Sequence, residues 1–193
     1  MSTRLGQLLA KIDQLNSEDP NSELGDGHQQ PRELVYSKRL SGWVLRLNPG
    51  ASEALRIAAR GQHVQRWTIP RHRYEMTRRG YLRWRETLKA FHAETIGHLM
   101  RDTGYAEAMI ERVGAIMGKR LLPQDADTQA LEDALCLVFL ETQFADLRNK
   151  TPDDKMAEIV RKTWVKMSGR GREEALRLPL SEDERTFLAR TLA

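Results

Sequence analysis

Residues 131–144 read LEDALCLVFLETQF, the most apolar stretch of this 193-residue chain, and they decide the fold class. A run of this kind is typical of a central, largely buried helix. Two acids, Glu132 and Asp133, begin the stretch. Because an unpaired buried carboxylate is very costly, the sequence predicts that a metal ion, an arginine or Lys119 compensates them.

The rest of the chain also repeats its apolar residues at helical spacing. We expect helices over residues 5–15, 31–47, 52–67, 77–103, 109–117, 127–144, 151–167 and a short one from Ser181, with Gly169 and Gly171 as interruptions. Residues 16–30 form a polar stretch that predicts a loop. No window alternates as a strand does, so we expect an all-α, single-domain helical bundle of seven or eight helices. The domain is predicted over residues 1–180, with a short C-terminal helix over 181–193.

Composition narrows the class of protein. The net charge is only +4, and no apolar run approaches the roughly 20 residues that span a bilayer. The first 15 residues lack the uninterrupted apolar region of a secretory signal, so we expect a cytoplasmic protein without a membrane partner. The single cysteine, Cys136, is expected to fill the core. The absence of strands and of a Gly-rich loop argues against dinucleotide and P-loop folds.

Positive charge is concentrated in residues 60–85. This segment has one acid, no lysine and eight arginines, at positions 60, 66, 71, 73, 78, 79, 83 and 85. Guanidinium groups match phosphate and carboxylate geometry, so the segment predicts an anion-binding pocket. Nucleic-acid binding is an alternative, with Trp67, Tyr74, Tyr81 and Trp84 stacking on bases. The helical spacing of Tyr81, Trp84 and Leu88 favours a core role for these aromatic residues instead.

Polar residues on three expected helices suggest a metal site. They are the pair Gln62-His63, then His92, then the pair Glu132-Asp133. Imidazole and carboxylate together suit Zn, Fe, Mn or Ni. The alternative is that His63 and His92 are hydrogen-bonded core histidines and that Asp133 pairs with an arginine. Spacing alone leaves both interpretations open.

Several segments resemble the uncharacterised family known as domain of unknown function 4202. The resemblance covers about residues 4 to 180 and lies in the segments 59–71, 78–85, 91–94, 131–141 and 162–172. It implies no activity.

The layout is also distantly similar to that of the HD-domain metal-dependent phosphohydrolases. In this resemblance Tyr36 stands where the first histidine of that family would be, and Gln62-His63 stands at the His-Asp doublet. His92 matches a later histidine, Lys119 replaces another, and Asp133 matches the final aspartate. The resemblance implies an HD-like fold.

These features give three functional predictions. The first is a divergent phosphohydrolase acting on a phosphorylated small molecule or nucleotide, with one divalent transition metal. Its expected residues are His63, His92, Asp133 and Gln62 at the metal, Arg66, Arg71, Arg78, Arg85 and Lys119 at the substrate, and Tyr74 or Glu132 orienting water. The second is a non-catalytic, regulatory anion-binding module in which Lys119 neutralises Asp133 without a metal. The third is nucleic-acid binding through residues 60–85. The oligomeric state is left open.

Overall fold

The computed structural model describes residues 3–25 and 27–192, and within these ranges the chain is predominantly helical. The helices are α1 (Arg4–Asn16), α2 (Arg32–Leu47), α3 (Glu53–Gly61), α4 (Arg78–Asp102), α5 (Glu107–Met117), α6 (Ala126–Thr142), α7 (Phe144–Asn149), α8 (Asp153–Trp164), α9 (Gly169–Leu176) and α10 (Glu182–Leu192). One small antiparallel hairpin consists of β1 (Ser22–Gly25) and β2 (His28–Pro31), and two 3₁₀ turns lie at Arg66–Thr68 and Arg71–Arg73. The predicted all-α class is confirmed, although the described residues form more helices than the seven or eight expected.

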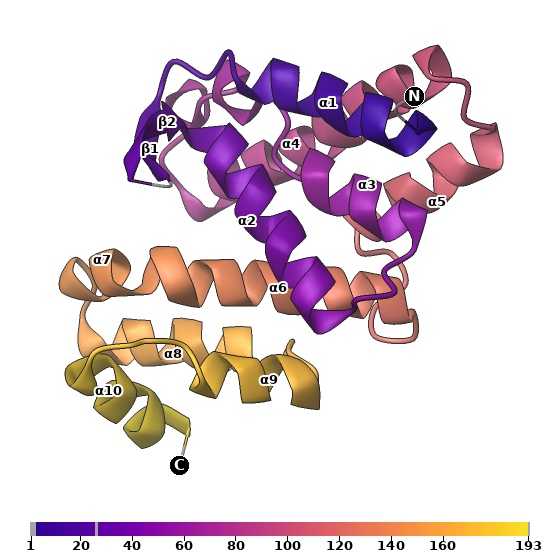
Figure 1. Cartoon of the computed structure of the whole chain (residues 1–193). Helices are drawn as coiled ribbons and strands as arrows, with labels where there is room; N and C mark the ends of the chain where they lie inside the picture. Colours follow the sequence, from indigo (N-terminus) through magenta and orange to yellow (C-terminus); the bar gives the residue numbers. More distant parts are fainter. Residues whose placement is uncertain (1–2, 26, 193) are drawn as a thin grey trace.

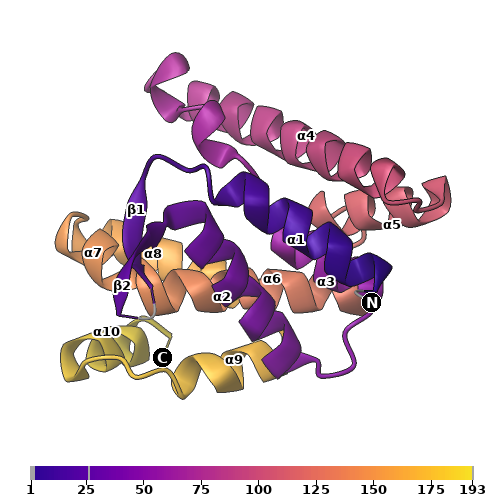
Figure 2. The ribbon, with the colours of Figure 1, turned by 45° about the horizontal axis from the view of Figure 1, so that its top comes forward.

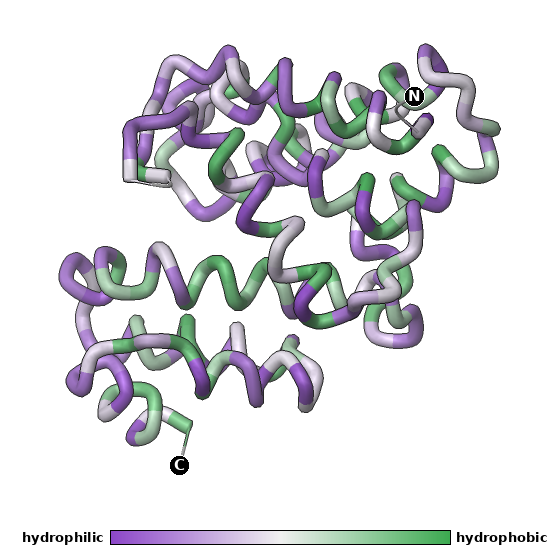
Figure 3. The backbone as a smooth tube through the Cα atoms, viewed as in Figure 1, coloured by the Kyte–Doolittle hydropathy of each residue, from purple (hydrophilic) through white to green (hydrophobic). Residues whose placement is uncertain are grey.

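Helix α6 runs through the middle of the molecule. In Figure 1 it lies between α2 and α3 on one side and α8 and α9 on the other. Figure 2 shows the long helix α4 on the far side of α1, next to α5. The hydropathy of α6 is high along most of its length (Figure 3), and Leu131, Leu137 and Val138 are fully buried. The prediction of a central buried helix is therefore confirmed.

The helix ends follow the local signals in the sequence. Ser52 accepts a hydrogen bond from Leu55 N at the start of α3, and Thr77 accepts one from Gly80 N at the start of α4. At α10, Ser181 and Glu184 form a capping box at the start that the sequence predicted, in which each side chain accepts from the other residue's backbone N–H. Helix α10 packs on α8, and its Phe187 belongs to the same core as α6.

Three boundaries differ from the sequence predictions. The expected loop over 16–30 contains β1 and β2, whose residues are mainly polar and are exposed or half-buried apart from Gly25, so they lack the apolar alternation that identifies a strand. The helix expected to reach Trp67 ends at Gly61, after which Gln65 adopts a left-handed φ of 50°. Gly169 and Gly171 do not interrupt a helix, since Ser168 caps a new one, α9, that begins at Gly169 and contains both glycines.

No helix among the described residues is long and apolar enough to cross a membrane, as the composition predicted.

Candidate functional site: a cationic cavity between α4 and α6

A cavity of about 500 Å³ lies between α4 and the layer formed by α6, α7 and α8. Its size is typical of small-molecule sites. It is lined by Tyr36 of α2; Gln62, His63 and Arg66 after α3; Tyr81, Arg85, Leu88, Lys89 and His92 of α4; Met117 and Lys119 at the end of α5; Glu132, Leu135, Cys136 and Phe139 of α6; and Gln143, Leu147, Ile159, Thr163 and Lys166. Polar groups and apolar groups thus share its wall.

Most of the residues predicted for the site line this cavity. They are Gln62, His63, Arg66, Arg85, His92, Lys119 and Glu132. Four predicted residues are not among the lining residues: Arg71, Tyr74, Arg78 and Asp133. The cavity therefore brings together residues from positions 62 to 132, while it leaves out the carboxylate expected to complete a metal site.

The end of α3 places Gln62 and His63 against α4. A Cβ on Gly61 would lie 2.5 Å from two side-chain carbons of Ile96, so only glycine permits this close approach. The backbone then turns at Gln65, whose N–H donates to Asn16 Oδ1 (3.2 Å). As a result, Val64 presents its carbonyl oxygen to α4.

His63 has a neighbour at each ring nitrogen, with a hydrogen bond from Arg66 at Nε2 and a close contact with Glu33 at Nδ1. Arg66 Nη1 lies 3.1 Å from Nε2, and because a guanidinium only donates, Nε2 is the acceptor and Nδ1 carries the proton. Nδ1 faces Glu33 Oε2 at 3.3 Å, and the Tyr36 ring stacks on the imidazole with centroids 4.0 Å apart. Burial and the nearby Arg66 hold the pKa of His63 well below its usual range. His63 is therefore a neutral side chain whose Nε2 accepts a hydrogen bond from Arg66.

Glu33, a residue that contacts His63 from α2, has an altered acidity. Burial raises its pKa to about 7, although the Arg66 charge opposes the shift. The carboxyl therefore changes its charge near neutral pH, directly beside the histidine.

His92 belongs to the buried stripe of α4 and is only 4% exposed. Its Nδ1 lies 2.8 Å from Val64 O. A carbonyl only accepts, so Nδ1 carries the proton and Nε2 presents a lone pair. Burial lowers the pKa of His92 to about 3. Nε2 has no hydrogen-bond partner among the described residues.

Glu132 faces two lysines across the cavity. Its side chain is 4% exposed and pairs closely with Lys119, while Lys166 Nζ lies 3.8 Å from the other carboxylate oxygen. Lys119 itself adopts a left-handed φ of 55° directly after α5. The predicted compensation of a buried acid by Lys119 therefore occurs, and the acid concerned is Glu132.

Asp133 points to a different neighbour. Its Oδ1 accepts hydrogen bonds from Ser168 N (2.8 Å) and Gln129 Nε2 (3.0 Å), and its Oδ2 accepts one from Ser168 Oγ (2.5 Å). Ser168 caps α9, and a Cβ on Gly171 would lie 2.7 Å from Asp133 Cγ. Asp133 thus fixes the start of α9, where a negative charge also complements the helix dipole. The expected grouping of Asp133 with His63 and His92 is not formed.

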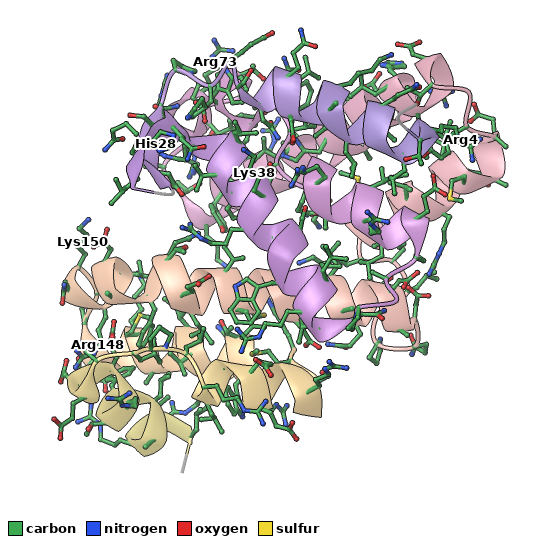
Figure 4. The ribbon with its side chains drawn as sticks, viewed as in Figure 1. Arg4, His28, Lys38, Arg73, Arg148 and Lys150 are labelled. Atoms are coloured by element: carbon green, nitrogen blue, oxygen red, sulfur yellow. The ribbon has the colours of Figure 1, made fainter. Side chains whose placement is uncertain are left out.

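The remaining predicted residues lie in or next to the turn before α4. Arg71 donates to the carbonyls of Tyr74 (2.9 Å), Glu75 (2.7 Å) and Thr77 (3.2 Å), so it holds the backbone of this turn. Arg78 is exposed, and Arg73, in the same basic segment, projects from the surface in Figure 4. Trp84 is core, as predicted, and donates to Ile69 O, whereas Tyr81 is 41% exposed. These arginines serve the turn and the outer surface instead of the cavity.

Comparison with known families adds one finding. A family model described as "Domain of unknown function (DUF4202)" matches residues 6–188, nearly the whole chain. The chain belongs to this family. No curated protein and no solved structure matches it.

Sequence reasoning missed several residues of this DUF4202 cavity. Glu33, Lys89, Thr163 and Lys166 were given no role there, although Glu33 contacts His63 and the others line the wall. The spacing there was informative, since Ile159 and Thr163 of α8 and Lys166 just after it recur at four- and three-residue steps.

The electrostatics of the DUF4202 cavity favour anions. Five cationic side chains and one carboxylate are found among its described lining residues. No group of three His, Cys, Asp or Glu side chains in the described part of the chain is arranged to hold a metal ion. Cys136 is buried, and burial raises the pKa of its thiol to about 12, so the thiol is unreactive. The arrangement can bind and orient a negatively charged group.

Proposed function

We propose that this protein binds a phosphorylated small molecule in the cavity between α4 and α6, as a binding or regulatory module. One observation carries the proposal: Arg66, Arg85, Lys89, Lys119 and Lys166 converge on a single cavity against the Glu132 carboxylate. Cations in a partly enclosed site attract an anion more strongly than cations in bulk water. Arginines add bidentate recognition of phosphate oxygens.

The cationic groups come from separate segments of the fold. Arg85 lies on α4, Lys119 follows α5, and Lys166 follows α8. Holding their like charges together destabilises the protein unless something negative lies among them. Glu132 offsets part of this repulsion through its contacts with Lys119 and Lys166, and a bound phosphate would offset the rest.

Isothermal titration calorimetry and thermal shift with inorganic phosphate and simple phosphomonoesters test the proposal. Arg85→Met should weaken binding by about tenfold or more, because a charge-assisted contact is lost. Arg83→Met is the matched control. Arg83 lies on the same helix and is exposed, and it is not a lining residue, so its substitution should leave the affinity unchanged. Binding that is absent in the parent protein, or equal in both variants, would overturn the proposal.

The metal-dependent phosphohydrolase is the second candidate, based on the resemblance to the HD-domain enzymes. The observation in its favour is that His63, His92 and Gln62 share one wall of the cavity, with the two imidazole centroids 6.0 Å apart. The donor set fits a metal poorly, because Arg66 occupies His63 Nε2 and Ser168 occupies both oxygens of Asp133. We therefore derive no catalytic step through a metal.

A direct experiment separates the two candidates. The protein is purified without a metal-affinity tag, its metal content is measured by mass spectrometry, and a panel of nucleotides and phosphomonoesters is assayed for hydrolysis with added Zn, Fe, Mn or Ni. Phosphate binding without metal and without turnover supports the binding module. Stoichiometric metal together with turnover supports the hydrolase.

Nucleic-acid binding by residues 60–85 stays a prediction from the sequence. Its support is the exposed arginines Arg73, Arg79 and Arg83 on the outer surface. Such binding would weaken steeply with salt and would be reduced by Arg83→Met, the variant that leaves small-ligand binding unchanged.

A further inference from the structure

The cavity offers many hydrogen-bond donors but also contains buried acceptors without partners. His92 Nε2 and Gln62 Oε1 are buried atoms that no described residue pairs. Both side chains line the cavity. A buried acceptor without a donor is unfavourable, so a ligand that brings donors to these atoms gains affinity.

The tautomer of His92 determines which chemical groups can form a hydrogen bond with its Nε2 atom. Since Nδ1 donates to Val64 O, Nε2 can only accept. A fully ionised phosphate has no proton to offer, and it is suited to the cations instead. A hydroxyl group is the donor that commonly accompanies a phosphate in a small molecule.

A metal cation could also use the lone pair of Nε2, but the local charge opposes it. The neighbouring His63 ring lies close enough to Arg66, Arg85 and Lys119 for all three to depress its pKa. A site with this positive potential repels a divalent cation and tolerates a neutral hydroxyl.

We propose that the ligand is a phosphorylated polyol or sugar, with a hydroxyl group donating to His92 Nε2 and a second one to Gln62 Oε1. This inference rests on the proposed phosphate-binding function and specifies its ligand class. The phosphate lies among the cations, and the hydroxylated carbons lie along the wall formed by α4 and the segment that follows α3. His92 is then the residue that distinguishes a polyol phosphate from a plain alkyl phosphate.

Paired ligands test the proposal by calorimetry at constant pH and ionic strength. Each polyol or sugar phosphate, such as glycerol 3-phosphate or glucose 6-phosphate, is compared with an alkyl phosphate of similar carbon number, such as propyl or hexyl phosphate. The best member of the hydroxylated set should bind at least about tenfold more tightly than its alkyl analogue, because a site built for a hydroxyl rejects the analogue that lacks it.

Two variants test which side chains cause the preference for hydroxylated phosphates over alkyl phosphates. His92→Asn keeps an amide nitrogen near the position of Nδ1, so the contact with Val64 O is retained, while Nε2 is removed. It should remove most of the preference, because the hydroxylated ligand loses its contact with Nε2, and it should weaken binding of the hydroxylated ligand more than binding of alkyl phosphate. His98→Asn is the control, since His98 is exposed on the same helix and does not line the cavity. Gln62→Met should reduce the preference in part.

The outcomes distinguish a failure of the proposed ligand class from a failure of the proposed phosphate binding. Equal affinities for every hydroxylated and alkyl pair would overturn the ligand class while leaving phosphate binding intact. A preference that is undiminished in His92→Asn, with circular dichroism showing the variant folded, would also overturn it. If neither alkyl phosphate nor inorganic phosphate binds, the proposed function itself fails.

Discussion

Glu132 and Asp133 are neighbours on α6, and both are almost fully buried, at 3% and 4% exposure. They nevertheless have different roles, because successive residues of a helix point about 100° apart. Glu132 faces the cavity and is compensated by the charges of Lys119 and Lys166, whereas Asp133 faces α9 and is compensated by hydrogen bonds from Ser168 and Gln129. Glu132 therefore belongs to the candidate site, whereas Asp133 stabilises the start of α9 next to it.

Because of this difference, substitutions at the two acids should change different quantities, the stability of the protein in one case and its affinity for anions in the other. Loss of Asp133 leaves the donors of Ser168 unpaired and loosens α9. Loss of the Glu132 charge changes the potential of the cavity and leaves the packing almost intact. Stability measurements should therefore respond to residue 133, and affinity measurements should respond to residue 132.

The largest expected effect is on stability at Asp133. Asp133→Ala removes three hydrogen bonds at a buried site and should lower the free energy of unfolding by about 3 kcal/mol. Urea denaturation followed by circular dichroism measures it. Asp133→Asn, which retains one acceptor oxygen, should lose less. A loss below about 1 kcal/mol in Asp133→Ala would show that α9 does not depend on this carboxylate.

A substitution on the other side of the same contact should have the next largest effect. Gly171→Ala places a Cβ 2.7 Å from Asp133 Cγ, so the carboxylate has to move away from Ser168. We expect a loss of about 2 kcal/mol in the same urea experiment, despite the higher helix propensity of alanine. Gly169→Ala is the control, since a Cβ there meets nothing within 4 Å. Equal stability of the two variants would contradict the close contact.

Glu132→Gln tests the other half of the comparison. The amide is nearly isosteric but carries no charge, so Lys119 becomes available to an incoming anion. The affinity for inorganic phosphate should rise by about five- to tenfold at low salt, and the gain should shrink as salt screens the charges. Calorimetry at two ionic strengths measures both effects. Weaker phosphate binding by this variant would mean that Glu132 positions Lys119 for the ligand instead of competing with it.

The features that could be predicted from the sequence are local ones. The Ser52 cap and the Ser181–Glu184 capping box depend on residues within one turn, and the burial of residues 131–144 follows from their composition. The strands β1 and β2 were missed because a short, exposed hairpin is defined by backbone hydrogen bonds, which leave little trace in side-chain pattern.

The site was predictable only in part, for a related reason. Spacing identified polar residues on apolar helices, but it did not show which of two adjacent acids faces the cavity. Glu33 is thirty positions from His63, and Lys166 is thirty-four from Glu132, so their contacts depend on how whole helices pack. The density of arginines was misleading for Arg71, whose guanidinium holds a turn.

The smallest expected effect concerns the buried side chain of His92. The two acids have partners for their charges, whereas His92 Nε2 has no hydrogen-bond partner among the described residues. Its pKa is about 3 in the folded protein and about 6.5 when exposed, so below pH 6.5 the unfolded chain binds a proton that the folded chain does not. By linkage, stability then falls as the pH is lowered. Over the first pH unit below 6.5 the loss from His92 should approach about 1 kcal/mol.

The pH slope of His92→Asn isolates this contribution. Glu33 titrates in the same range with the opposite sign, since its pKa is raised to about 7 and its protonated form favours folding, and His63 also contributes. Both are present in the parent and in the variant, so the difference between the two urea-derived stability curves reports His92 together with its electrostatic coupling to His63. Parallel curves between pH 5.5 and 6.5 would mean that His92 is protonated as readily in the folded chain as in water. Below pH 6.5 its Nε2 would then be a donor, and the cavity wall would have no acceptor there for a hydroxyl group at that pH.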